Sequence, residues 1–112
     1  MRLLLPVALA LVVAVPLGRA TTAPSTVVPV TVALNPTSVT LSRSEAARGN
    51  VVEFRVRNAT GSHRMFSVAD RTISIPAMTT RRVAIFFNAR GRYRYSSRTA
   101  SGRTIHGIFR IV

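Results

Sequence analysis

The sequence of 112 residues contains no cysteine. Disulfide bonds are therefore excluded, and so is a lipoprotein anchored through an acylated cysteine. A chain of this length supports one domain, and its 47% apolar and 17% charged residues are typical of a globular protein. A folded domain in this chain must consequently be stabilised by its hydrophobic core alone.

Lysine is also absent, and acidic residues are scarce. The sequence has 16 arginines and three acids, Glu45, Glu53 and Asp70. This imbalance can provide a surface for an anionic partner, such as an envelope component or an acidic protein. It can equally reflect codon bias, with arginines that merely solvate the outer faces of the domain. Because the arginines are scattered and no aromatic stacking platform accompanies them, nucleic acid is not expected as a partner.

The sequence lacks the residue patterns that are typical of the common classes of enzyme site. No two acids are close in sequence, which argues against the paired carboxylates of a glycosidase, and no glycine-rich phosphate loop is present. Ser97, His63 and Asp70 supply the residue types of a catalytic triad, but no nucleophile elbow surrounds Ser97. We therefore expect that the protein is not an enzyme.

The N-terminus has the pattern of a secretory signal peptide. A basic start at Arg2 precedes an apolar run at 3–17 and the small residues Gly18 and Ala20, and cleavage is predicted after Ala20. The apolar run is interrupted by two prolines and is shorter than the roughly 20 residues that cross a bilayer. We expect no membrane span after cleavage.

Three segments follow from this assignment. They are a signal peptide at 1–20, a flexible leader rich in Thr, Pro and Ser at 21–29, and one domain at 30–112. The predicted location is periplasmic or extracellular. Fourteen arginines and three acids remain after cleavage, so the mature chain carries a net charge of +11.

Alternating apolar and polar residues predict a series of short strands. Val52, Phe54 and Val56 alternate with charged residues, which places three apolar side chains on one face. Seven or eight such strands are expected, at 30–34, 39–41, 51–56, 64–68, 72–75, 80–87, around Tyr93 and Tyr95, and around Phe109 and Ile111. A single capped helical turn is expected after Ser42. The predicted fold class is all-β, a Greek-key β-sandwich.

One short motif has two interpretations. Asn58-Ala59-Thr60 matches the acceptor pattern for N-glycosylation. Asparagine also supports turns through its own side chain, and a turn is predicted at 58–63. We therefore assign Asn58 a structural role in that turn.

A set of glycines, aromatic residues and turn residues runs through the chain in a particular order and spacing. It comprises Gly49, Val52, Phe54, Val56, Asn58, His63, Phe66, Pro76, Gly91, Tyr93, Tyr95, Gly107, Phe109 and Ile111. This set resembles the cupredoxin family, especially its small plastocyanin-like members, over roughly 27–112. In that family a copper ion is held by a His after the Asn-containing turn and by Cys, His and Met from the loop joining the last two strands.

The resemblance implies that most of the copper ligands have been replaced. With Tyr93 and Gly107 aligned to the family, the four ligand positions fall in chain order at His63, Ser97, Ala100 and Ile105. Without the Cys, no type 1 copper site can form. Shifting His106 to the Met position would turn Arg110 into the core, and strand parity rejects that shift.

Two functions stay open at this point. The first is a non-redox binding or structural module of the cell envelope, which uses the loop end around His63, 97–103 and His106. Arg98 and Arg103 would make that end positive and favour an acidic partner.

The second function is a residual copper-binding or copper-handling protein that uses His63 and His106 as metal ligands. Met65 and Met78 are the thioethers that remain after cleavage, and both are more typical of core or rim packing. No other cofactor is expected, and the sequence does not define an oligomeric state.

Overall fold

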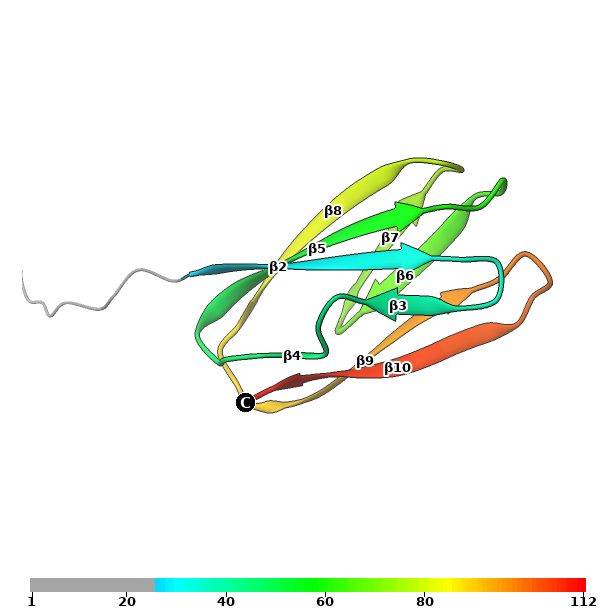
Figure 1. The fold of residues 1–112 in the computed structure, drawn as a ribbon. Coiled ribbons are helices and arrows are strands. Elements are labelled where there is room, and N and C mark those ends of the chain that lie inside the picture. The colour runs from blue at the N-terminus through cyan, green and yellow to red at the C-terminus, as the bar shows by residue number, and fades with distance from the viewer. Residues whose placement is uncertain (1–25) are drawn as a thin grey trace, which may run out of the picture.

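A computed structural model describes residues 26–112 of the chain, which form two β-sheets and no helix (Figure 1). The predicted signal peptide, 1–20, lies outside these residues, as does 21–25 of the predicted leader. The nine strands are β2 (Val27–Leu34), β3 (Val39–Leu41), β4 (Glu45–Ala46), β5 (Asn50–Asn58), β6 (Arg64–Val68), β7 (Arg71–Ile75), β8 (Thr80–Phe87), β9 (Gly91–Arg98) and β10 (Thr104–Ile111).

Both sheets are mixed. One has the order β3-β2-β5-β8, in which β2 and β5 run parallel, and the other has the order β4-β10-β9-β6-β7, in which β10 and β4 run parallel. All remaining neighbours are antiparallel. The two sheets share one core, so the expectation of an all-β sandwich is confirmed at this level.

The core is built from the alternating apolar residues that predicted the strands. Phe54 of β5 has no exposed surface and packs edge-on against Phe109 of β10, with ring centroids 5.2 Å apart. Its ring also lies 6.3 Å from that of Phe66 on β6. Because β5 belongs to one sheet and the other two strands to the second, these rings join the sheets through the middle of the sandwich.

Two local predictions differ from the structure. No helical turn follows Ser42; instead Glu45 and Ala46 form β4, which pairs with the end of β10 and buries Ala46. Strand β2 begins at Val27, three residues before the predicted domain boundary, because Val27 and Val28 pair with β5. By contrast, the predicted strands at 64–68 and 80–87 match β6 and β8 at both ends.

Four connections lie together at one end of the sandwich, and we call this end the loop end (Figure 1). They are the segments 35–38, 59–63, 76–79 and 99–103. Within residues 26–112 there is no helix long and apolar enough to cross a membrane.

Candidate functional site

The buried polar side chains gather at the loop end, while the rest of the core is apolar. They are Asn58, Thr60, Arg64, Ser97 and Thr99, each with at most 9% of its surface exposed. Burying a polar group is unfavourable unless hydrogen bonds replace its contacts with water. The burial of each of these five side chains therefore requires a structural or a functional explanation.

Asn58 has a structural explanation. Its Nδ2 donates to the carbonyl oxygens of Ser62 at 2.8 Å and Ile75 at 3.0 Å, and its Oδ1 accepts from the backbone N–H and hydroxyl of Thr60. One side chain thus fixes the 59–63 loop and ties it to the end of β7. The turn role assigned to Asn58 is confirmed, and its fully buried amide is not presented for glycosylation.

Thr99 has a similar role in the last loop. Its hydroxyl accepts from the backbone N–H of Arg103 at 3.2 Å, and its carbonyl accepts from the N–H of Gly102 at 2.9 Å. Gly102 has a φ of +91°, a conformation that favours glycine. The 99–103 loop is therefore held in one closed shape beside the buried polar cluster.

Arg64 is the unusual member, because a charged residue is almost never fully buried unless it is paired. Its side chain lies on the inner face of β6 and is 2% exposed. Its Nη1 donates to the carbonyl of Asn35 at 2.9 Å, and its Nη2 donates to Oγ of Ser97 at 3.2 Å. Ser97 in turn donates to the carbonyl of Met65 at 2.7 Å, so both hydrogen-bonding roles of the hydroxyl are used.

The Nε–H of Arg64 is buried and has no hydrogen-bond acceptor among residues 26–112. An unmade hydrogen bond of this kind is unfavourable by about 1–3 kcal/mol. The two groups that Arg64 does contact are a carbonyl and a hydroxyl, both neutral. A full positive charge is thus held by dipoles alone.

No acid neutralises this charge within residues 26–112. Glu45 pairs with Arg110, Glu53 pairs with Arg55 at 2.9 Å and Arg82 at 3.9 Å, and Asp70 lies in the turn after β6, at the opposite end of that strand. Burial lowers the pKa of the Arg64 guanidinium, because the charged form loses contact with water. An anion placed beside Arg64 would offset this desolvation.

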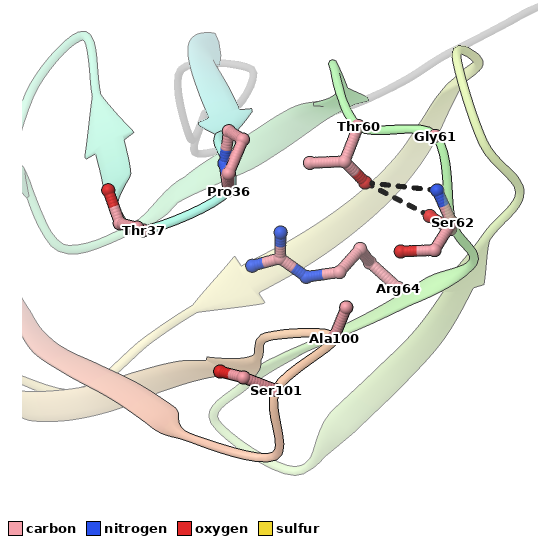
Figure 2. A pocket seen from close by; sticks show the side chains of 8 residues that line it. All are labelled: Pro36, Thr37, Thr60, Gly61, Ser62, Arg64, Ala100 and Ser101. Atoms are coloured by element: carbon pink, nitrogen blue, oxygen red, sulfur yellow. Dashed lines mark hydrogen bonds between the residues drawn. The ribbon is translucent and has the colours of Figure 1, made fainter.

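Arg64 extends across a pocket between the loops of this end (Figure 2). In the view, Thr60, Gly61 and Ser62 lie above the guanidinium side chain, Ala100 and Ser101 lie below it, and Pro36 and Thr37 lie beyond its tip. The pocket has a volume of about 510 Å³ and is lined by these eight residues. Three of the four loops at this end contribute to it, namely 35–38, 59–63 and 99–103.

The structure gathers most of the positions that the resemblance assigned to copper ligands, but not His63. Ser97 contacts Arg64, Ala100 lines the pocket, and Ile105 pairs with Ser97 across β9 and β10. The residue that reaches Ser97 from β6 is Arg64, one position after His63. Arg64 is two and four residues before Phe66 and Val68, so it lies on the same face of the strand as these buried residues. This sequence signal identifies Arg64 as an inward residue, and the alignment on His63 overlooked it.

His63 and His106 lie elsewhere. His63 is exposed and its ring contacts the hydroxyl of Ser74. His106 is exposed on the outer face of β10, opposite Ser96 of β9, and Ser96 is in turn opposite Ser67 of β6. His63 is thus separated from His106 by two inter-strand spacings across the sheet and four residues along the strand direction. At standard strand spacings this corresponds to roughly 16 Å between their Cα atoms.

The structure therefore does not bring these two imidazoles together. Met65 and Met78 are also exposed at the surface, by 42% and 57%. No group of three or more His, Cys, Asp or Glu side chains within 26–112 is placed to hold a metal ion. A copper site that uses His63 or His106 would therefore need further ligands that this arrangement of side chains does not supply.

The three residues considered as a catalytic triad are also separated. Ser97 is buried and bonded to Arg64 and Met65, whereas His63 lies on the outer face and Asp70 lies at the opposite end of β6. No hydrogen bond joins any two of the three among the contacts of the described residues. The chemistry that this end does support is recognition of an anion by a fixed guanidinium.

A scan against protein-family models finds none that matches the chain, and a search of curated proteins finds no similar sequence.

Proposed function

We propose that this chain is an exported, cupredoxin-like Greek-key β-sandwich that has lost its type 1 copper site. In this proposal it acts as a non-redox binding module of the cell envelope, and its loop end takes an anionic partner. The observation that carries the proposal is Arg64, a buried cation without an acidic partner in residues 26–112, at the floor of the pocket.

Strand order supports the fold part of the proposal. The chain passes from one sheet to the other at five connections, which are β3 to β4, β4 to β5, β5 to β6, β7 to β8 and β8 to β9. Crossings of this kind are what a Greek-key sandwich requires. Ser97 bonds to Arg64, Ala100 lines the same pocket, and Ile105 pairs with Ser97. This arrangement supports the further step that this end corresponds to the copper-binding end of the family.

The replacement of ligands has a consistent electrostatic meaning. In the family, a metal cation lies among side chains from the first His position and the last loop. Here the guanidinium of Arg64 reaches Ser97 from the strand that follows the Asn-containing turn. A fixed organic cation thus takes the place of a bound metal cation, and electron transfer is exchanged for anion recognition.

The copper-handling alternative receives less support, because His63 and His106 project from the outer face and lie roughly 16 Å apart by strand spacing. The anion-binding proposal also agrees with the composition of the chain. Arg98 and Arg103 are exposed at the two ends of the 99–103 loop and add positive charge to the loop end, although neither lines the pocket.

Binding of an acidic polymer tests the proposal. We expect the protein to bind poly-L-glutamate, and the double variant Arg98→Gln/Arg103→Gln to bind about two- to thirtyfold more weakly, because two exposed charges contribute roughly 0.2–1 kcal/mol each. The affinity of the wild type is expected to fall as sodium chloride rises from about 50 mM to about 500 mM, since exposed charges are screened. Titration calorimetry measures both effects.

The matched control is Arg92→Gln/Arg94→Gln, which removes the same charge from the outer face of β9, further from the loop end. Equal weakening by the two double variants would mean that the polymer senses only net charge. That outcome, or polymer binding without any salt dependence, would contradict a partner site at the loop end.

A further inference from the structure

We infer that the pocket beside Arg64 is a carboxylate site, and that its ligand carries one carboxylate on a small, mainly apolar body. This inference rests on the proposed function, because it names the chemistry of the anionic group that the loop end takes. Four features of the pocket carry it.

The first feature is the fixed position of the cation. Asn35 and Ser97 hold the guanidinium of Arg64 through Nη1 and Nη2 at 2.9 and 3.2 Å. A guanidinium that is already ordered loses little further freedom when a ligand arrives, which favours binding. Arg64 is therefore prepared for a ligand rather than free to move into solvent.

The second feature is unused donor capacity. A guanidinium has five N–H donors, and the contacts of Arg64 with Asn35 and Ser97 use two of them. Its buried Nε–H has no acceptor within residues 26–112. These two contacts also leave one N–H on each of Nη1 and Nη2 over. A planar carboxylate accepts two parallel hydrogen bonds from this pair of end groups, which makes it the group that fits this donor geometry.

The third feature is the amount of charge. Arg64 is the one cationic side chain among the described residues that line the pocket. A single guanidinium balances a singly charged carboxylate, whereas a phosphate group carries a charge near −2 at neutral pH and calls for further cations. The charge balance thus favours a carboxylate over a phosphate.

The fourth feature is the character of the walls. Pro36, Gly61 and Ala100 offer carbon surface around the polar floor, and the hydroxyls of Thr60 and Ser101 are engaged with Asn58 and Thr99. The volume of about 510 Å³ lies within the range of about 300–1,000 Å³ that small-molecule sites occupy. A short apolar body joined to the carboxylate fits these walls.

Sodium propionate is the probe that tests the inference, with propionamide as its uncharged counterpart. Propionate should produce saturable shifts of the backbone amide resonances of Gly61, Ser62, Ala100 and Ser101, and propionamide should not. Inorganic phosphate should bind more weakly than propionate. Amide ¹H–¹⁵N spectra of the purified protein at constant ionic strength measure all three.

Two variants locate the site. Arg64→Gln should weaken propionate binding at least tenfold, and Ala100→Leu, which fills the pocket from an exposed loop position, should weaken it similarly without altering Arg64. Arg92→Gln, an equal loss of charge on the outer face of β9, should leave binding unchanged. If Arg64→Gln does not fold, Ala100→Leu and Arg92→Gln still decide the matter.

Three results would overturn the inference. The first is the absence of saturable shifts up to about 50 mM propionate, a concentration at which a millimolar site is filled. The others are phosphate binding as tight as propionate binding, and propionate binding by Ala100→Leu as tight as that of the wild type. Polymer binding through Arg98 and Arg103 without propionate binding would reject the carboxylate site and keep the proposed function. Propionate binding without polymer binding would keep the carboxylate site and reject a polymeric partner at the loop end.

Discussion

Asn58 shows how much of the loop end depends on a single side chain. Its amide group connects the 59–63 loop to the end of β7 through three carbonyls, those of Ser62, Ile75 and Pro76. Asparagine is suited to this position because its amide both donates and accepts. We therefore expect a shorter or a charged side chain at this position to lose part of the network.

We expect Asn58→Ala to lower the free energy of unfolding by about 2–4 kcal/mol, because it leaves several buried backbone groups without partners. Urea denaturation measures this change. Asn88→Ala, at an exposed position after β8, is the control and should alter stability by less than about 0.5 kcal/mol. A loss at position 58 no larger than at position 88 would mean that the network contributes little.

Arg64 shows where sequence analysis stopped short at the same scale. Assigning Phe66 and Val68 to the inner face of one strand also assigns Arg64 to that face, because side chains alternate with a period of two. The charge of Arg64, however, predicted an exposed position, since arginine is rarely buried. The polar partners that make its burial tolerable, Asn35 and Ser97, come from 29 and 33 residues away, and strand periodicity does not reveal such distant contacts.

Among the elements, β9 and β10 are fitted closely together at Gly107. Tyr95 lies directly opposite Gly107, and a Cβ atom at Gly107 would lie 2.1 Å from the ring carbon and the hydroxyl oxygen of Tyr95. The ring of Tyr95 also lies 6.2 Å from that of Phe66. Gly107 thus provides the space in which Tyr95 covers the inner face of β10.

Gly107→Ala is expected to destabilise the fold by about 1–3 kcal/mol, because Tyr95 must move out of its packed position. Gly61→Ala is the matched control, since a Cβ there meets no atom within 4 Å. Thermal unfolding followed by circular dichroism compares the two. Equal melting temperatures for both variants would mean that the Tyr95 ring moves aside without loss.

Strands with alternating apolar residues were the elements most readily predicted from sequence. The pattern at 64–68 and 80–87 reproduces β6 and β8, and the inward placement of Phe109 and Ile111 is confirmed by their burial. The segment after Ser42 was predicted wrongly as a helical turn. Its local helix-forming residues are overruled by pairing of Glu45 and Ala46 with Arg110 and Ile111, far away in the chain.

At the scale of the whole molecule, positive charge dominates. Residues 26–112 contain 14 arginines and three acids, and two of the acids, Glu45 and Glu53, are already in ion pairs. Excess charge of one sign opposes the compact state through repulsion. The hydrophobic core, which has no disulfide to assist it, must outweigh that repulsion.

Stability should therefore rise when salt is added. Raising sodium chloride from about 50 mM to about 500 mM shortens the range of repulsion between arginines. A gain of about 1 kcal/mol would raise Tm by roughly 4–8 °C in a domain of this size. Differential scanning calorimetry measures the shift, and a Tm that falls with salt would mean that the three ion pairs outweigh the repulsion.

The guanidinium of Arg64 also determines what the loop end does not depend on. It is part of the polypeptide, so its charge is present as soon as the chain folds and requires no delivery of an ion. Chelators cannot remove it, and changes in redox potential cannot alter its valence. Across the physiological pH range it also stays protonated, since arginine gives up its proton only in strongly alkaline solution. The anion binding that we propose for this end would therefore be the same in surroundings starved of trace elements and in surroundings rich in them.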